Sequence, residues 1–205
     1  MIERRTGDPR PSAPNSPDVE AAFAVVDLET GGLNPLSDPV LQIAVVGGVT
    51  TVDPVGFHVT DEWCTTVRLD RPWRRYGARH IHGIRRHRLL MAPSLRSAMQ
   101  QLTRVCGQRT VVAHNLAFDW SFIEAAAIRT GVATPSGPHL CTLQLSRSLD
   151  PTRALSHRLG DIAARLGIPH DKAHDALGDA RTTAHALPHL LAARRLADGT
   201  DTQAR

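Results

Sequence analysis

The sequence contains few aromatic residues, a single lysine and only three cysteines. Aromatic residues make up 4% of the 205 residues, against 41% for hydrophobic residues as a whole, so the core must consist mainly of small aliphatic side chains. The cysteines are odd in number and far apart, which excludes a disulfide framework and a zinc site built from close cysteine pairs. We therefore expect Cys64, Cys106 and Cys141 to be free thiols.

Long hydrophobic runs are also absent. No stretch approaches the roughly 20 apolar residues that a membrane span requires, and the N-terminal residues lack the apolar centre of a signal peptide. These absences predict a cytoplasmic protein with no membrane partner. Residues 1–20 are rich in proline, serine and charge without apolar periodicity, and we expect them to form a disordered N-terminal arm.

The positive charge is unevenly distributed along the chain. The 24 basic and 20 acidic residues give a net charge of +4, which permits nucleic-acid binding without establishing it. Between Arg68 and Arg88, however, eight arginines accompany one acidic residue, Asp70. This segment is either a solvated surface of an arginine-rich protein or a surface that faces phosphate groups, and the sequence leaves both interpretations open.

Hydrophobic periodicity predicts one α/β domain. Strand patterns cover Phe23–Leu28, Val40–Val49, Trp63–Leu69 and Thr110–Ala113, and helical patterns cover Pro93–Cys106, Ala117–Thr130, Leu155–Leu166 and Asp175–Leu196. Gly131 and Gly167 are placed to cap helices, whereas Pro188 should kink or end the last helix near Leu187. Early strands with hairpin-like links, followed by alternating strands and helices, indicate a mixed sheet in a domain at 21–196, with a tail at 197–205.

Two acidic residues end the first predicted strand, in "FAVVDLETGG". The two-residue period of a strand directs the side chains of Asp27 and Glu29 to one face and that of Leu28 to the other. Two neighbouring carboxylates resist ionisation in a partly dry site unless a hard divalent cation lies between them. The pair alone is equally consistent with acids that simply reach solvent at a strand end.

A second acidic position follows a later strand, in "VVAHNLAFDWSF". Asp119 falls in the first turn of the next predicted helix, where the helix dipole favours an acid, so on its own it is either a helix-terminal charge or a site residue. It lies about 100° around the helix from Phe118, which belongs to the packed stripe. Asp119 is therefore free to face the edge of the sheet.

The third stretch, "AHDALGDA", pairs a histidine with an acid. His174 and Asp179 are five residues apart. On a continuous helix their side chains would diverge by about 140°, so they converge only if His174 belongs to the preceding loop. Asp175 is then the natural N-cap of the last helix.

Together these three stretches resemble the DnaQ-like 3′–5′ exonucleases of the DEDDh subgroup, in the RNase H-like superfamily, which include the proofreading epsilon subunit of bacterial DNA polymerase III. "DLETGG", "HNLAFD" and "HDALGDA" occur in the order and at the spacing of the family's three motifs. The lesser segments "IHGI", "CTL" and "LGDIAARLGI" are also similar, so the resemblance covers about residues 22–192. It implies an RNase H-like exonuclease fold, with a mixed five-stranded sheet flanked by helices.

The resemblance also implies a metal site and a general base. Asp27, Glu29, Asp119 and Asp179 would hold two Mg²⁺ or Mn²⁺ ions about 4 Å apart, of which one prepares the attacking water and the other stabilises the leaving 3′ oxygen. Asp27 would bridge both ions. His174 would act as the general base, because a neutral imidazole with a reference pKa of about 6.5 accepts a proton near neutral pH.

Substrate contacts follow from the same resemblance. Thr30 and Gly31 would lie along the terminal nucleotide, and Leu33 would wedge between the last two bases. The remaining expected substrate-binding residues are His82, Asn115 and Phe118. For Leu33 and His82, a place in the hydrophobic core is an equally good interpretation.

The predicted function is metal-dependent removal of nucleoside monophosphates from 3′ ends, most readily of single-stranded or frayed DNA, as in repair or proofreading. A 3′–5′ exoribonuclease that trims RNA or short oligoribonucleotides is the first alternative, since the same site serves both sugars. A non-catalytic nucleic-acid-binding module is the second. The chain ends soon after its last helix, so we expect a free-standing enzyme or one recruited by an unidentified polymerase or repair partner.

Overall fold

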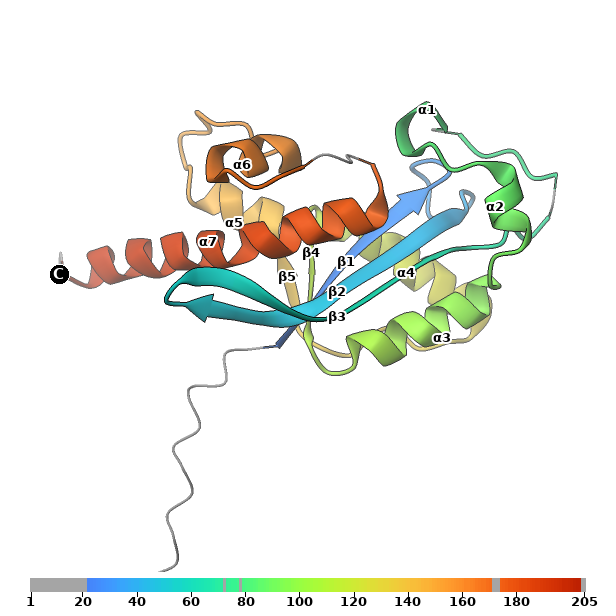
Figure 1. The fold of residues 1–205 in the computed structure, drawn as a ribbon, viewed down its shortest axis with the longest axis horizontal. Coiled ribbons are helices and arrows are strands. Elements are labelled where there is room, and N and C mark those ends of the chain that lie inside the picture. The colour runs from blue at the N-terminus through green and yellow to red at the C-terminus, as the bar shows by residue number, and fades with distance from the viewer. Residues whose placement is uncertain (1–21, 72, 78, 171–173, 204–205) are drawn as a thin grey trace, which may run out of the picture.

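The computed structural model describes residues 22–71, 73–77, 79–170 and 174–203, which form one sheet with helices on both faces (Figure 1). The arm predicted for residues 1–20 lies outside the described residues. The strands are β1 (Ala22–Thr30), β2 (Val40–Val52), β3 (Val55–Thr66), β4 (Thr110–Ala113) and β5 (His139–Cys141). The helices are α1 (Arg79–His82), α2 (Arg86–Leu90), α3 (Leu95–Cys106), α4 (Leu116–Thr130), α5 (Thr142–Ser148), α6 (Leu159–Leu166) and α7 (Ala176–Gln203).

The sheet is mixed and has five strands in the order β3-β2-β1-β4-β5. β1 pairs antiparallel with β2, and β2 pairs antiparallel with β3, so the first three strands form the predicted hairpin-linked meander. β4 runs parallel to β1, and β5 runs parallel to β4. The α/β class and the mixed five-stranded sheet predicted from the sequence are therefore confirmed, and β1 lies at the centre of the sheet.

The two faces of β1 pack against different helices. Ala24, Val26 and Leu28 belong to a buried cluster that also contains residues of α3 and α4. Phe23 and Val25 belong to a second cluster with residues of α7. Because side chains alternate along a strand, Asp27 and Glu29 continue the α7 face. The alternation of β1 thus determines which helix the two acids meet.

Small residues allow α7 to lie close to the sheet. Ala176, Ala180 and Ala184 recur every fourth residue and are fully buried in the cluster that contains Phe23 and Val25. Residues at this spacing share one face of a helix, and the short alanine side chain brings the helix backbone near the strands. This close packing positions Asp179, in the first turn of α7, beside the end of β1.

The structure differs from the sequence prediction at three elements. β3 begins at Val55, well before the predicted Trp63, because the edge strand pairs with β2 through a stretch that includes Asp61 and Glu62. α6 begins at Leu159 rather than Leu155. α7 continues through Pro188 to Gln203, so of the predicted kink or end near Leu187, the end is wrong. Leu187, just before Pro188, is fully buried, and this packing offsets the backbone hydrogen bond that proline removes.

Several smaller predictions are confirmed. Gly131 and Gly167 cap α4 and α6 in the left-handed conformation, with φ angles of 65° and 67°. All three cysteines are free thiols, and burial raises the pKa of Cys106 to about 12. Among the described residues, none of the helices combines the length and apolar content that crossing a bilayer requires.

Candidate active site

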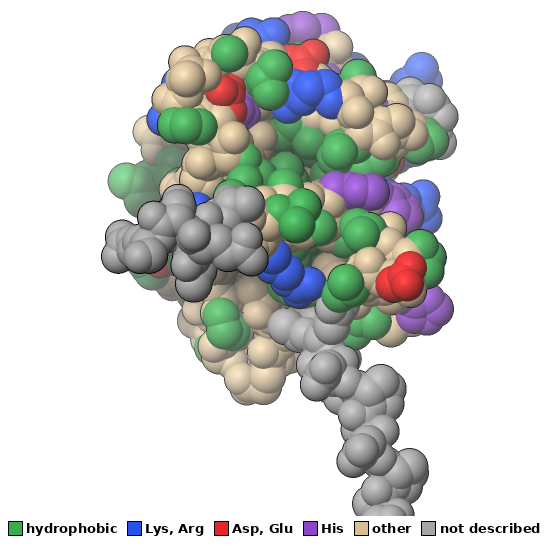
Figure 2. Space-filling model, turned by 90° about the vertical axis from the view of Figure 1, so that its left-hand side faces the viewer, with side chains coloured by type: hydrophobic (Ala, Val, Ile, Leu, Met, Phe, Trp, Pro, Cys, Tyr) green, Lys and Arg blue, Asp and Glu red, His purple; other side chains and the backbone are tan. Residues whose placement is uncertain are grey.

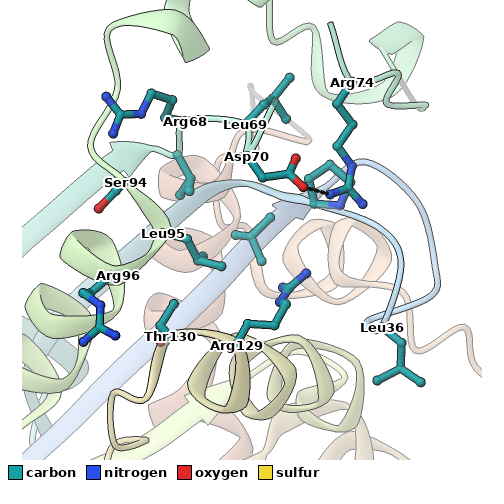
Figure 3. A pocket seen from close by; sticks show the side chains of 13 residues that line it. Leu36, Arg68, Leu69, Asp70, Arg74, Ser94, Leu95, Arg96, Arg129 and Thr130 are labelled. Atoms are coloured by element: carbon teal, nitrogen blue, oxygen red, sulfur yellow. Dashed lines mark hydrogen bonds and ion pairs between the residues drawn. The ribbon is translucent and has the colours of Figure 1, made fainter. Parts of the chain in front are cut away.

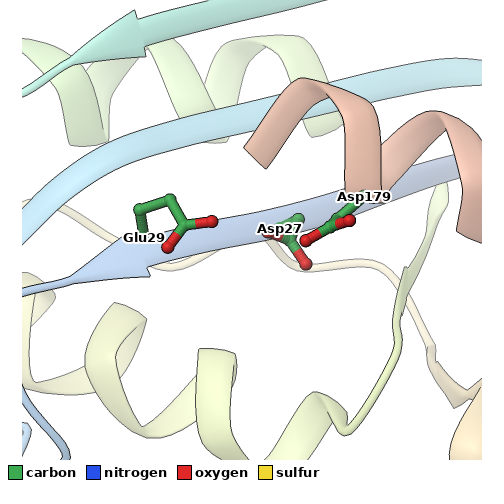
Figure 4. Close-up of side chains that lie close together, drawn as sticks. All are labelled: Asp27, Glu29 and Asp179. Carbon is green, nitrogen blue, oxygen red and sulfur yellow. The ribbon is translucent and has the colours of Figure 1, made fainter. Parts of the chain in front are cut away.

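Three of the four predicted acids converge at the end of β1. Asp27 and Glu29 extend from the same face of the strand, and Asp179 reaches them from the first turn of α7 (Figure 4). One carboxylate oxygen from each of the three lies within 4.8 Å of the others. The predicted common face of Asp27 and Glu29 is therefore confirmed, and Asp179 joins them across the interface between the sheet and α7.

Asp119 lies directly beside this group. It is 3% exposed in the first turn of α4, and its Oδ1 accepts a hydrogen bond of 3.1 Å from the backbone N–H of Leu28, between the two acids of β1. This bond ties the start of α4 to the end of β1. Asp119 is close enough to raise the pKa of Asp27 by charge repulsion, so the four predicted acids form one electrostatic group.

The acids share an environment that disfavours their charged forms. Burial, followed by repulsion from Asp119, Asp179 and Glu29, raises the pKa of Asp27 well above its ordinary value. Burial and repulsion from Asp179 raise the pKa of Glu29 to about 7. Burial raises the pKa of Asp119 to about 8, although the hydrogen bond from Leu28 opposes the shift. Part of the group therefore carries protons at neutral pH when no cation is bound.

The donor set fits a hard divalent cation. Among the described residues, no arginine forms an ion pair with Asp27, Glu29, Asp119 or Asp179. Oxygen donors are the ligands that Mg²⁺ and Mn²⁺ prefer, and a bound cation removes the repulsion that raises these pKa values. Asp27, Glu29 and Asp179 are the residues whose oxygen atoms are arranged to hold it.

Two histidines contact Asp179 in different ways. His174 belongs to the loop before α7, as expected, but its side chain is exposed, and it contacts Asp179 through its backbone N–H, which donates to Oδ2 at 3.0 Å. The imidazole that contacts the acid is that of His170, whose Nε2 lies 2.7 Å from Asp179 Oδ1. Sequence reasoning missed His170, and the only available signal was its position shortly before the third motif.

Asp175 confirms the predicted start of α7. Its Oδ2 accepts a hydrogen bond of 3.3 Å from the backbone N–H of Gly178, and its carbonyl oxygen accepts one from the N–H of Asp179. These bonds are those of an N-cap residue. Asp179 is therefore fixed at the helix start by the cap and oriented by contacts from His170 and His174.

The segment after β1 contains the first predicted substrate residues. Thr30 is buried, and its hydroxyl donates to the carbonyl of Gly32. A Cβ atom at Gly31 would lie 2.8 Å from Pro39 and 2.9 Å from Tyr76, so only glycine fits there. Leu33 is 84% exposed, which excludes the alternative interpretation that it belongs to the core. The backbone at Gly31 is thus packed against Pro39 and Tyr76, whereas the side chain of Leu33 is exposed and can contact a substrate.

The remaining predicted substrate residues lie in different environments. His82 is buried, and both of its ring nitrogens bond within the chain, to the carbonyl of Gly77 and the N–H of Ile84. Asn115 is exposed, with a φ angle of 69°, just before α4. Phe118 is half-buried and packs against Phe122, with ring centroids 5.1 Å apart. His82 therefore has a structural role that fixes the α1 region, and its contact with substrate stays a prediction.

Comparisons with known proteins identify the family of the chain. Residues 24–187 match the family model of the RNase T exonucleases. The chain is 31% identical over 173 residues to a putative bifunctional exonuclease/endonuclease protein of Mycobacterium tuberculosis, covering 84% of this chain and 27% of that protein. It is 34% identical over 182 residues to a DNA polymerase III subunit epsilon-like protein of Rhodobacter capsulatus, covering 83% of this chain and 24% of that protein.

A solved structure shows the same fold. The chain superimposes on E. coli exonuclease I in complex with a dT13 oligonucleotide with a TM-score of 0.69 and 19% identity, covering 87% of this chain and 43% of that one. The chain spans about a quarter of the length of the two curated relatives. The family match extends across all three acidic motifs, and the chain therefore belongs to the RNase T exonuclease family, in agreement with the resemblance carried by those motifs.

Proposed function

We propose that the protein is a metal-dependent 3′–5′ exonuclease that releases nucleoside monophosphates from 3′ ends. The observation that carries the proposal is the group formed by Asp27, Glu29 and Asp179, with Asp119 beside it and no arginine paired to any of them within the described residues. A domain that only binds nucleic acid gains nothing from buried acids that repel one another. The same acids are needed by an enzyme that binds divalent cations next to a phosphodiester.

Each acid has a distinct role in this proposal. Asp27, which is repelled by all the others, would serve as the ligand shared by both cations. Glu29 and Asp179 complete the ligand set, and Asp119 acts partly through bound water. Two Mg²⁺ or Mn²⁺ ions, when bound, supply an activated water and stabilise the charge on the leaving oxygen. His170 orients Asp179 through the bond to Oδ1.

His174 is the proposed general base. Its backbone N–H donates to Asp179 Oδ2, and this bond holds the backbone of His174 next to the acids. Its side chain is exposed and can therefore turn toward a water molecule at the site. Its φ angle of 64° is unusual for a residue other than glycine. The hydrogen bond to Asp179 therefore helps to stabilise this backbone conformation beside the acidic group.

The proposed substrate is a single-stranded or frayed 3′ end of DNA. Thr30 and Gly31 line the approach to the acids, and the exposed Leu33 inserts between the last two bases. A paired end must first be unstacked, at a cost of a few kcal/mol, so an unpaired end is preferred. DNA is favoured over RNA because the structural neighbour holds a dT13 oligonucleotide. A polymerase partner is compatible with the epsilon-like relative.

A panel of 5′-labelled substrates tests this function. Single-stranded DNA, duplex DNA with a mismatched 3′ end, fully paired duplex DNA and RNA of the same sequence are each incubated with Mg²⁺ or with EDTA. We expect a ladder of shortened products in Mg²⁺, fastest on single-stranded DNA, and none in EDTA. If RNA is cleaved faster than DNA, the proposed substrate becomes the 3′ end of RNA. Binding without cleavage under every metal condition would overturn the enzymatic proposal.

A further inference from the structure

A pocket of about 550 Å³ lies between the loop that follows β1, the start of α3 and the end of α4 (Figure 3). Its lining includes Val40, Val67 and Leu95, which belong to the cluster on the α3 and α4 side of the sheet. The acids Asp27 and Glu29 lie on the α7 side. The pocket is therefore separate from the acidic group, although both adjoin the end of β1.

The charge in this pocket is strongly unbalanced. Its lining contains four arginines, Arg68, Arg74, Arg96 and Arg129, and a single acid, Asp70. Asp70 forms an ion pair of 2.7 Å with Arg74. Within the described part of the chain, the guanidinium groups of Arg68, Arg96 and Arg129 make no ion pair. Three positive charges around one cavity are thus left without a counter-charge.

Two further features make the pocket favourable for an anion. The pKa of Arg129 is lowered by burial and then by repulsion from Arg74, which Asp70 partly opposes, so the surroundings of Arg129 disfavour its positive charge. The pocket also contains Ser94, the N-cap of α3, where the helix dipole adds partial positive charge. A bound phosphate group relieves the first effect and gains from the second.

The floor of the pocket is apolar. Val40, Val67 and Leu69 are buried aliphatic residues of its lining, and Leu95 and the exposed Leu36 add to its apolar surface. A ligand that satisfies both parts must join an anionic group to a flat or apolar body. A nucleotide unit has this composition, because its phosphate can meet the arginines while its base or sugar covers the aliphatic side chains.

The loop between β1 and β2 connects this pocket to the acidic group. Gly31, two residues after Glu29, donates its backbone N–H to the carbonyl of Pro39, which lines the pocket. Arg74 donates to the carbonyl of Ser37 in the same loop and so holds it in place. Leu33 and Leu36 are 84% and 80% exposed along this loop. The same loop therefore borders the end of β1 and contributes Leu36 and Pro39 to the pocket.

We propose that this pocket binds a phosphodiester unit of the same nucleic-acid strand, upstream of the 3′ nucleotide that is cleaved. This inference rests on the proposed function, because "upstream" is defined relative to the nucleotide that the enzyme removes. The residues that form the pocket do not depend on that function. It predicts that the enzyme holds long single strands more tightly than short ones, and that the difference depends on Arg96 and Arg129.

The test combines a pocket variant with two substrates of different length. In the double variant Arg96→Gln/Arg129→Gln, both charges are removed while polar side chains remain. A labelled dT15 reaches the pocket, whereas the p-nitrophenyl ester of thymidine 5′-monophosphate occupies only the acidic group. Arg195→Gln, at an exposed position near the end of α7, removes one charge away from the pocket and controls for charge loss elsewhere on the surface.

We expect the double variant to lose at least about tenfold in kcat/KM on dT15, with kcat/KM on the p-nitrophenyl ester unchanged. The log–log salt dependence of dT15 binding should flatten by about 1.4, since each lost phosphate contact on a single strand contributes about 0.7. Arg195→Gln should change neither value. Thermal melting of all variants checks that the fold is retained.

Other outcomes overturn the inference in distinguishable ways. Unchanged kcat/KM and salt slope on dT15 would show that the pocket holds no strand. Equal losses of kcat/KM on both substrates would show that the substitutions disturb the acidic group or the fold, and not a separate site for the strand. Normal dT15 binding with loss of affinity for a poly-glutamate peptide would assign the pocket to an acidic protein partner. If the wild-type protein cleaves neither substrate, the proposed function fails, and loss of dT15 binding in the double variant still supports the pocket.

Discussion

The end of β1 separates two regions of opposite charge. At the end of β1, Asp119 from the start of α4 adjoins the three acids on the α7 face, and Glu29 and Asp119 are only 9% and 3% exposed. On the α3 and α4 side, four arginines surround an open pocket with one acid. The difference follows from acid–base chemistry, because a carboxylate can bind a proton when it is buried, whereas a guanidinium keeps its charge and needs solvent or an anion. Buried acids are therefore poised for cations, and the open arginines for phosphate.

This separation of charge is not general over the surface. The end of the molecule shown in Figure 2 carries basic, acidic and histidine side chains interspersed among hydrophobic and neutral ones. Ion pairs elsewhere are balanced, as between Arg109 and Asp61 and between Arg181 and Glu62. The two regions beside β1 differ from these balanced pairs, and their separate roles can be tested one at a time.

Removing the central acid should have the largest effect. Asp27→Asn removes charge from the position repelled by all the other acids, and we expect the cleavage rate to fall at least about a thousandfold, or roughly 4 kcal/mol of barrier. EDTA should abolish wild-type cleavage. The rate is measured on single-stranded DNA with saturating Mg²⁺. Asp53→Asn, at the exposed turn between β2 and β3, is the control and should leave the rate unchanged.

A folded Asp27→Asn variant that keeps most of the wild-type rate would contradict the assignment of the metal site. Melting temperatures in EDTA separate this outcome from misfolding. The variant should be at least as stable as the wild type without metal, because it loses a repelled carboxylate.

Substitution of the two histidines beside Asp179 should affect different steps, catalysis for His174 and metal binding for His170. His174→Ala should slow cleavage by about a hundred- to ten-thousandfold and flatten the acidic limb of the pH–rate profile, because the proposed base is lost while the metal ligands remain. His170→Ala should lower Mn²⁺ affinity instead, since it frees Asp179 from its oriented contact. Calorimetric Mn²⁺ titrations beside the pH–rate profiles measure both effects. The reverse pattern would move the base to His170.

Metal binding should depend on pH in a definite direction. Because the pKa values of Glu29 and Asp119 are raised to about 7 and about 8, cation binding near neutral pH must displace protons. We expect Mn²⁺ affinity below about pH 7 to increase by up to about tenfold per pH unit for each proton displaced, and to level off above about pH 8. Calorimetry in buffers of different ionisation enthalpy measures the released protons. Affinity that is independent of pH over this range would contradict the raised pKa values.

The stability of the metal-free protein should have the opposite pH dependence. A carboxyl whose folded pKa is raised stabilises the fold fully below its unfolded pKa, and this contribution is lost as the pH rises through the folded value. For Glu29 and Asp119 the loss extends from about pH 4 to about pH 8. The melting temperature in EDTA should therefore fall across this range, and Mg²⁺ should restore it at the alkaline end. A melting temperature in EDTA that rises toward pH 8 would be the contrary result.

The smallest expected effect is a difference in DNA binding between variants of two neighbouring arginines, Arg74 and Arg75. Arg74 lines the arginine pocket, whereas Arg75 is exposed and does not. Arg74→Gln should weaken dT15 binding a few-fold and reduce the salt slope by about 0.7, while Arg75→Gln should change the slope less. Fluorescence anisotropy over a range of salt concentrations measures both. Equal slopes for the two variants would favour a diffuse positive surface over a defined pocket.

The secondary structure could be predicted where local patterns are strong. β1, β2, β4, α3 and α4 follow from apolar periodicity and caps, and their observed bounds lie close to the predicted ones. β5, with three residues, and α5, with seven, are too short for a periodic pattern. The early start of β3 and the passage of α7 through Pro188 depend on pairing with β2 and on burial against the sheet.

The sequence by itself determined the identity and order of the acids, their common face on β1 and the family to which they belong. These features are encoded by residue type and by spacing within single segments. Only the tertiary structure decided that His170 contacts Asp179 and that Arg96 and Arg129 join Arg68 and Arg74 around one pocket. The four arginines come from segments far apart in the chain, and the contact of His170 depends on the path of the loop before α7. Neither arrangement is recorded in a local pattern of residues.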